Sequence, residues 1–188
     1  MDQKQEWELV VKVKAGDMTA YQTLLNHHLP SLSHYVARMT VNSADAEEII
    51  QDVFLRFWQK AEQYNPQRAK LSTWLHQIAY NICVDFFRKN DKHNIQKHEI
   101  ITASKDSPQQ TFESKQASEI LKEAITALPE NQRCALVLSH YQGLSNRETA
   151  EVLEISVDAL ESLLRRARKK LQSSLNSRGL ERNENNNE

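Results

Sequence analysis

The chain has 188 residues and a formal net charge of −1, and 39% of its residues are hydrophobic. This length suits one or two small domains. With 3 Gly and 4 Pro, the chain has few of the residues that an all-β fold needs at its turns, so the composition favours an all-α fold. It contains no run near the ~20 apolar residues of a membrane span, and its start lacks a basic flank followed by an apolar core, so we expect a cytoplasmic protein.

The first part of the chain carries apolar residues at helical spacing with one early break. Gly16 can end a first helix and Asp17 can cap a second. Pro30 is then expected to open a third helix that continues to Met39.

A long helix is expected from Ala44, capped by Asn42 or Ser43, and its sequence gives it two faces. One face is an apolar stripe expected to lie in the core: Ile50, Val53, Phe54, Phe57 and Ala61. The other face mixes acidic, amide and apolar side chains: Glu48, Gln51, Asp52, Leu55 and Trp58. Taken alone, this second stripe fits a solvated face, but acids around an aromatic anchor also fit the core of a protein interface.

A turn and a further helix follow this long helix. The pair Asn65–Pro66 breaks the helical pattern, and Ser72 is expected to cap the next helix. The buried side of that helix is expected to consist of Trp74, Leu75, Ile78, Ala79, Ile82 and Phe86. Because Trp74, Tyr80 and Phe86 lie in or beside this stripe, we interpret them as core residues rather than as stacking platforms for bases.

The chain is polar from residue 91 to residue 116, which indicates a flexible linker. A second helical part is expected to begin near Ala117, and Pro129 can open its next helix. Residues 177–188 are rich in Asn and Glu, and we expect them to be disordered.

The second helical part ends in the stretch "GLSNRETAEVLEISVDALESLLRRARKKL", Gly143–Leu171. In it, Ser145 and Glu148 have the spacing of a reciprocal capping box, and Ser156 can cap a second helix. Two short helices joined by a tight turn are typical of a helix-turn-helix, whose second helix enters the DNA major groove. The second helix ends in a basic cluster, Arg165, Arg166, Arg168, Lys169 and Lys170. A plain helical hairpin with a solvated basic end fits the same periodicity.

Three segments in this order, residues 43–89, 128–145 and 143–171, together resemble the extracytoplasmic-function sigma factors of bacterial RNA polymerase. The resemblance covers about residues 10–175. It implies two small helical domains joined by a flexible linker. Residues 1–90 would form a domain like sigma region 2, residues 91–116 the linker, residues 117–176 a helix-turn-helix domain like sigma region 4, and residues 177–188 a tail.

The resemblance also implies which residues contact partners. In the family, the helix that carries the mixed stripe docks on the coiled coil of the largest polymerase subunit, which would involve Glu48, Gln51, Asp52, Leu55 and Trp58. The loop at residues 65–71 and the helix after it would hold a flipped base of the −10 element and the melted strand, using Asn65, Gln67, Arg68, Lys70, Asn81, Arg88 and Lys89. The −35 element would be read by Ser162, Arg165, Arg166, Arg168 and Lys169.

The chain departs from the family pattern at three positions of the helix-turn-helix. Glu154 stands where the tight turn often holds glycine, and a non-glycine residue forced to positive φ costs on the order of 1 kcal/mol. Glu161 and Leu163 stand where many relatives carry basic residues. A carboxylate facing phosphates is unfavourable, although it can accept a hydrogen bond from a cytosine amino group.

Cysteines and histidines give no sign of a metal site or a disulfide. Cys83 and Cys134 both lie within apolar helical patterns and are expected to be reduced core residues. The adjacent pair His27–His28 and the separated His93 and His98 lack the spacing or the cysteine neighbours of a structural metal site, so no metal is expected.

The sequence therefore predicts a promoter-specificity subunit that binds core RNA polymerase and promoter DNA. It has no Gly-rich phosphate loop and no nucleophile motif, so we expect neither enzymatic activity nor a cofactor. The resemblance also implies a partner anti-sigma factor, a class of inhibitor that is often membrane-anchored. Two alternatives remain: a stand-alone helix-turn-helix regulator that binds a palindromic operator as a dimer, and a helical scaffold without DNA function.

Overall fold

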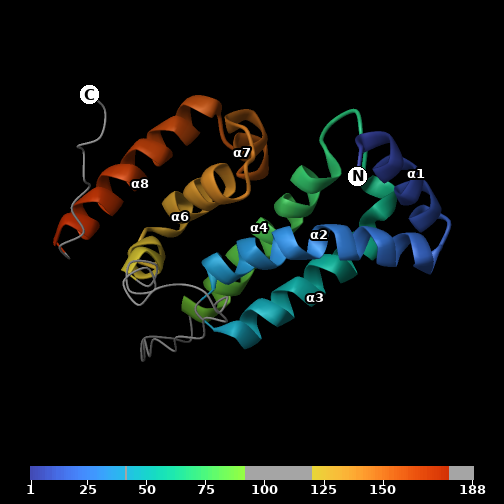
Figure 1. Cartoon of the computed structure of the whole chain (residues 1–188), viewed down its shortest axis with the longest axis horizontal. Coiled ribbons are helices and arrows are strands. Elements are labelled where there is room, and N and C mark those ends of the chain that lie inside the picture. The colour runs from blue at the N-terminus through green and yellow to red at the C-terminus, as the bar shows by residue number, and fades with distance from the viewer. Residues whose placement is uncertain (41, 92–119, 178–188) are drawn as a thin grey trace, which may run out of the picture.

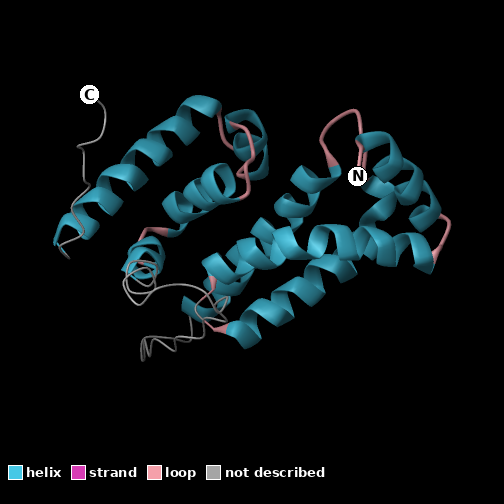
Figure 2. Ribbon diagram, viewed as in Figure 1, coloured by secondary structure: helices cyan, strands magenta, loops and turns pink. Residues whose placement is uncertain are grey.

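The computed structural model describes residues 1–40, 42–91 and 120–177 (Figure 1). All regular structure in these ranges is helical, which confirms the all-α prediction (Figure 2). The elements are α1 (Gln3–Lys14), α2 (Met18–Met39), α3 (Ser43–Lys60), the short η1 (Ala61–Gln63), α4 (Leu71–Asp91), a helical segment at residues 120–126, α6 (Glu130–Leu136), the π-helical η2 (Val137–Tyr141), α7 (Asn146–Val152) and α8 (Val157–Ser177). Most of the expected linker and the tail after residue 177 lie outside the described residues. None of the described helices combines the length and hydrophobicity of a bilayer-spanning segment.

Local capping signals fix several of the helix ends. Gly16 has a φ of 87°, and the Asp17 carboxylate accepts hydrogen bonds from the backbone N–H groups of Thr19 and Ala20, so the predicted break and cap are both confirmed. Asn42 caps α3, because its side-chain oxygen accepts a hydrogen bond of 2.9 Å from the Ala44 backbone N–H. Such caps satisfy backbone donors that have no partner inside the helix.

The prediction that Pro30 opens a new helix is wrong. Pro30 lies inside α2, which runs unbroken through it. A proline inside a helix removes a backbone donor and costs about 3 kcal/mol or more. Leu24, Leu32 and Val36 are fully buried on both sides of Pro30, so packing of the apolar face outweighs that cost and keeps α2 continuous.

Two smaller expectations also need correction. The helix expected to be capped by Ser72 begins at Leu71, so Ser72 lies within the first turn, where its carbonyl accepts a hydrogen bond of 2.8 Å from His76 Nδ1. In α3, Ile49 is 1% exposed while Ile50 is only partly buried, so the core stripe is rotated toward Ile49. Leu71 is itself fully buried. Burial of apolar side chains therefore determines both where α4 begins and which isoleucine of α3 lies in the core.

Helices α1–α4 pack around a core in which Phe57 is central. The Phe57 ring lies 5.8 Å from Tyr21 and 6.2 Å from Trp74, measured between ring centroids, and Phe57 is fully buried. Trp74, Tyr80 and Phe86 are all partly buried against the hydrophobic core, in keeping with their interpretation as core residues.

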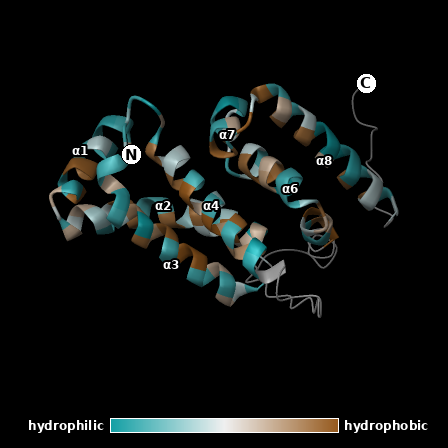
Figure 3. Ribbon diagram, turned by 180° about the vertical axis from the view of Figure 1, so that it is seen from behind, coloured by the Kyte–Doolittle hydropathy of each residue, from teal (hydrophilic) through white to brown (hydrophobic). Residues whose placement is uncertain are grey.

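The second helical group packs directly on the first. α7 contacts α4, and η2 contacts α2, so the hydrophobic core continues from one group into the other. Cys83 and Cys134 are both free and buried in this core, as predicted, and Cys134 Sγ lies 4.0 Å from Met39 Sδ across the boundary. Burial raises the pKa of Cys134 to about 12, with the Glu130 charge acting in the same direction, so this thiol stays protonated. The C-terminal half of α8 points away from this core and is largely hydrophilic (Figure 3).

Candidate nucleic-acid interface and docking face

The mixed stripe of α3 lies on the outer face of that helix. Glu48, Gln51, Asp52 and Leu55 are exposed, and Leu55 is 52% exposed although it is a large apolar residue. Trp58 is partly buried and its ring lies 5.1 Å from that of Tyr21 in an edge-on contact. The stripe therefore presents two carboxylates beside exposed apolar surface. That composition suits a protein-docking face more than a purely solvated one.

The loop after η1 is built by its own polar side chains. The Asn65 side-chain oxygen accepts a hydrogen bond of 2.9 Å from the Gln67 backbone N–H, and the Tyr64 hydroxyl donates one of 3.2 Å to the Ala69 carbonyl. Burial raises the pKa of Tyr64 to about 12, so the hydroxyl remains a donor. Asn65 therefore shapes the loop, while Gln67 and Arg68 are exposed on it.

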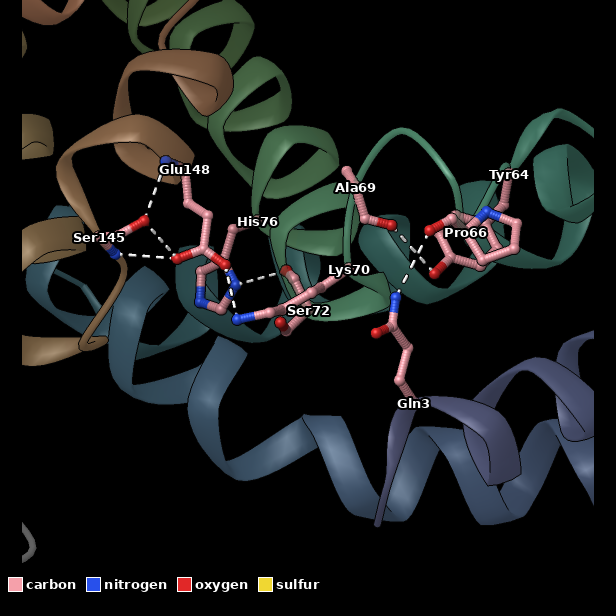
Figure 4. A network of polar contacts seen from close by, with 9 residues as sticks. All are labelled: Gln3, Tyr64, Pro66, Ala69, Lys70, Ser72, His76, Ser145 and Glu148. Carbon is pink, nitrogen blue, oxygen red and sulfur yellow. Dashed lines mark hydrogen bonds and ion pairs between the residues drawn. The ribbon is translucent and has the colours of Figure 1, made fainter.

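Helix α1 supports this loop from one side. The Gln3 side-chain amide donates a hydrogen bond of 3.4 Å to the Pro66 carbonyl (Figure 4). Lys14 Nζ lies 3.2 Å from the Tyr64 carbonyl oxygen. A hollow of about 520 Å³ opens here, lined by Trp7, Glu62, Gln63, Tyr64, Asn65, Pro66, Gln67 and Arg68. Trp7 is not among the residues that the sequence predicts for this site. No local signal could have done so, because Trp7 is distant from the loop in sequence and reaches it only through packing of α1.

The other residues expected at the −10 element do not line the hollow: Lys70 ends the loop just before α4, and the rest lie along α4. Asn81, Arg88 and Lys89 are exposed, and Arg88 pairs with Asp85 at 3.0 Å. Asn81 lies ten residues after Leu71, which corresponds to about 15 Å of helix. Asn81 is therefore not part of the hollow that the loop residues line.

The helix-turn-helix has the predicted caps and the predicted strained turn. The Ser145 side chain accepts from the Glu148 backbone N–H, and the Glu148 carboxylate accepts from the Ser145 backbone N–H at 2.9 Å, which completes the capping box. The Ser156 hydroxyl accepts a hydrogen bond of 3.2 Å from the Ala159 backbone N–H at the start of α8. Glu154 sits in the turn with a φ of 56°, the left-handed conformation expected where relatives often hold glycine.

Replacing Glu154 by glycine should stabilise the helix-turn-helix. Glycine removes the strain of positive φ, worth about 1 kcal/mol, but loses the hydrogen bond of 3.1 Å that Gln77 donates to the Glu154 carboxylate. Glu154→Ala loses the same bond and keeps the strain, so it is the matched control. We expect the free energy of unfolding, measured in urea, to rank glycine above wild type and wild type above alanine. Equal stability of the glycine and alanine variants would contradict a strained turn.

The basic cluster of α8 is exposed because the opposite face of the helix is buried. Leu160, Leu164 and Ala167 lie in the core, which turns the basic side chains outward. Those exposed side chains are Arg165, Arg166, Arg168, Lys169 and Lys170, with Ser162 partly buried beside them. Arg166 Nε donates to the Ser162 carbonyl at 3.2 Å, and an Arg168 guanidinium nitrogen lies 3.3 Å from His140 Nε2. An exposed positive helix face of this kind can contact DNA phosphates and base edges.

The first helix of the helix-turn-helix is tied to the loop and to α4. Lys70 Nζ lies 2.9 Å from the Glu148 carboxylate, which therefore sits between the capping serine and the lysine (Figure 4). The hydrogen bond from Ser145 and then the Lys70 ammonium lower the pKa of Glu148 to about 2, against partial burial, which raises it.

Further contacts join η2 to α2. The Gln142 side-chain amide lies 2.7 Å from the Ser31 hydroxyl, and the Arg38 guanidinium lies 4.3 Å from the centroid of the Tyr141 ring. The structure thus brings the loop at residues 65–71 to the helix-turn-helix, a proximity that sequence spacing does not predict.

Comparison with known proteins agrees with this arrangement. The chain matches the family models for Sigma-70 region 2, over residues 24–93, and Sigma-70, region 4, over residues 118–171. It is 31% identical over 170 residues to the ECF RNA polymerase sigma factor SigM of Mycobacterium tuberculosis, covering 90% of this chain and 84% of that protein. It is 28% identical to SigW of Bacillus subtilis, an ECF RNA polymerase sigma factor, covering 88% of this chain and 94% of that protein.

Solved structures share the fold at lower identity. CnrH, solved in complex with the cytosolic domain of CnrY, superposes with a TM-score of 0.71 at 22% identity and covers 92% of this chain and 98% of that one. RpoE of Bartonella quintana, solved with the anti-sigma factor NepR, gives a TM-score of 0.72 at 22% identity and covers 83% of this chain and 96% of that one. With the sequence matches to both sigma regions, these similarities establish that the chain belongs to the extracytoplasmic-function (ECF) sigma factors, which direct bacterial RNA polymerase to promoters.

Proposed function

We propose that this sigma factor docks on core RNA polymerase through the α3 stripe, contacts the −10 element through the loop at residues 65–71 and α4, and contacts the −35 element through α8. The observation that supports the proposal best is the exposure of the α3 stripe and of the α8 basic cluster, on helices whose other faces are buried. Residues 1–90 would act as the region 2 domain and residues 117–176 as the region 4 domain.

We propose neither a catalytic residue nor a cofactor for the chain. The polymerase carries out the chemistry of RNA synthesis, and the sigma factor acts by binding, in the cytoplasm where polymerase works. A stand-alone regulator would need only the helix-turn-helix, whereas the chain also matches region 2 over residues 24–93.

A reconstituted transcription assay tests the function directly. The purified protein, added to core polymerase and a library of promoter fragments from its host, should produce transcripts that start downstream of a shared pair of −10 and −35 sequences. Core polymerase alone should give no such transcripts. Specific binding to a palindromic site without polymerase, together with no transcript from the mixture, would instead support the stand-alone regulator.

The contact between Lys70 and Glu148 links the two parts of the DNA-binding surface. We assign Lys70 to the −10 element, yet its ammonium is bonded to the carboxylate that caps the first helix of the helix-turn-helix. The Lys70 side chain is 63% exposed and its ammonium has further donors, so it can reach a promoter phosphate, but the Glu148 carboxylate offsets its charge. Free protein with this contact intact is therefore expected to bind DNA weakly.

The Lys70–Glu148 contact should weaken in acid. The folded-state pKa of Glu148 is lowered from its usual 4.5 to about 2. The ionised carboxylate therefore contributes fully to the free energy of unfolding above about pH 4.5, and this contribution is lost as pH falls toward 2. The Lys70 side chain is 63% exposed, so the pair is expected to contribute about 0–1 kcal/mol at neutral pH. A double-mutant cycle with Lys70→Met and Glu148→Gln, measured by urea unfolding, gives this coupling.

Glutamine at position 148 is a suitable replacement because it can still complete a capping box while carrying no charge. The coupling should be measurable at neutral pH and should approach zero near pH 2. A coupling that does not change with pH would show that the ion pair makes no contribution.

We also propose an anti-sigma factor as partner. Both solved relatives described above were solved in complex with another protein, CnrH with the cytosolic domain of CnrY and RpoE with the anti-sigma factor NepR. The exposed Leu55 and the carboxylates around it offer a face that such an inhibitor could cover. Affinity purification from uninduced cells should recover a further protein besides polymerase, and recovery of polymerase alone would count against the inhibitor.

A further inference from the structure

Two histidines of α2 and a glutamate of α1 meet where these helices pack against each other. His28 Nε2 lies 3.2 Å from the Glu6 carboxylate, and His27 Nε2 lies 4.0 Å from the same carboxylate oxygen. The two imidazole rings are 4.9 Å apart, and the three candidate ligand atoms all lie within 4.8 Å of one another. The turn at residues 15–17 reverses the chain, which is why residues distant in sequence face one another here.

The His28 ring nitrogen at this point is buried without a hydrogen bond of good geometry. The His28 side chain is only 8% exposed, and its Nε2 makes no hydrogen bond among the described residues, although it lies 3.2 Å from the Glu6 carboxylate. In one neutral tautomer Nε2 carries a proton that it can donate to Glu6, and in the other it carries a lone pair. In the second tautomer the lone pair and the carboxylate can together bind a cation.

We propose that Glu6, His27 and His28 bind a divalent transition metal of the zinc class. Imidazole nitrogen and carboxylate oxygen are ligands that zinc prefers, at about 2.0–2.2 Å. Tetrahedral coordination at those lengths places ligand atoms about 3.3–3.5 Å apart. The Glu6–His28 pair already has nearly this spacing, and the other distances need only a small movement of His27, whose side chain is 42% exposed.

The surroundings of His27 are compatible with coordination. The His27 ring packs edge-on against the His28 ring, and its Nε2 lies 4.0 Å from the Glu6 carboxylate oxygen. Its exposed side leaves a fourth position open to water. The site thus has three protein ligands and one solvent ligand, an arrangement that zinc accepts.

A metal at this position would connect α1 to α2 near the loop. Glu6 precedes Trp7, which lines the hollow, and Gln3 on the same helix donates to the Pro66 carbonyl. An ion held by Glu6 would therefore restrict the motion of the α1 wall of the hollow. The metal site does not depend on the promoter contacts proposed above, so either can fail without the other.

Zinc titration of the metal-free, untagged full-length protein tests the proposal. Isothermal calorimetry at neutral pH should show one tight equivalent of Zn²⁺, and Co²⁺ in its place should give the visible absorption of a tetrahedral site. Zn²⁺ should also raise the thermal unfolding midpoint. His27→Ala and Glu6→Gln should each weaken binding by more than the roughly 10–100-fold that loss of an outer-shell group costs.

His34→Ala is the matched control, because His34 is an exposed histidine on the same helix outside the cluster. It should bind Zn²⁺ like the wild type. Circular dichroism should show that all variants keep their helix content, since neither His27 nor Glu6 fills the core. Absence of binding to the wild type, or undiminished binding by both His27→Ala and Glu6→Gln, would overturn the proposal and leave a direct contact of His28 Nε2–H with the Glu6 carboxylate.

Discussion

The double variant Glu48→Lys, Asp52→Lys should lose co-elution with core RNA polymerase at micromolar concentration, while the wild type co-elutes. Both residues are exposed on the outer face of α3, before the exposed Leu55 in the same stripe. Reversing two charges within an interface places like charges together if the partner surface is complementary, and each such contact costs several kcal/mol. A loss of about 2.7 kcal/mol already weakens binding 100-fold, so we expect complete loss in size-exclusion chromatography.

The variant Glu8→Lys, Glu62→Lys is the matched control for this experiment. It makes the same change in net charge at exposed positions of the same helical group, outside α3. It should co-elute with polymerase like the wild type. If both double variants lose binding, net charge rather than the α3 stripe determines association, and the docking assignment would be withdrawn.

The features that sequence predicted correctly are mostly local. The capping box of Ser145 and Glu148, the cap at Asp17 and the strained turn at Glu154 each depend on residues within one turn of one another. Hydrogen bonds between such neighbours form in almost any tertiary setting, so their spacing carries the information. The same holds for the basic face of α8, which follows from helical periodicity.

The features that sequence missed depend on packing between distant segments. Pro30 has every local signal of a helix start, but burial on both sides of it keeps α2 continuous. Nothing in the spacing of Lys70 and Glu148 indicates that they form an ion pair. Likewise, nothing in the sequence indicates that Glu6 of α1 lies beside His27 and His28.

The mixed stripe of α3 lies between these two cases. Its periodicity correctly separated an outer face from an inner one, although the core side is rotated toward Ile49. The periodicity of apolar residues shows which side of a helix faces the core, but only to within the width of that side. Packing against neighbouring helices then determines which of two adjacent residues is buried. Assignment of the partner of that face came from the family resemblance and still requires the co-elution experiment.

Replacing Arg165 and Arg166 together by alanine should abolish −35-dependent transcription while leaving polymerase binding intact. Both guanidinium groups are exposed on α8, and only Arg166 has a recorded local contact, to the Ser162 carbonyl. An arginine that contacts a base contributes about 1–3 kcal/mol of discrimination against the wrong base. An arginine that contacts a phosphate adds about one to the slope of log affinity against log salt concentration. Loss of both residues is therefore expected to lower output from the best promoter by roughly 100-fold or more.

The two single variants separate reading of bases from binding of phosphates. A residue that reads a base should lose discrimination between −35 sequences, whereas a residue that binds phosphate should weaken all promoters equally and reduce the slope of affinity against salt. Lys122→Ala is the control, since Lys122 is an exposed cation of the same helical group outside α8. Glu161 lies one helical turn before Arg165 and repels phosphate, so Glu161→Gln should raise affinity for all promoters if α8 faces the DNA backbone there. Unchanged transcription by the double arginine variant would place the −35 contact on another surface.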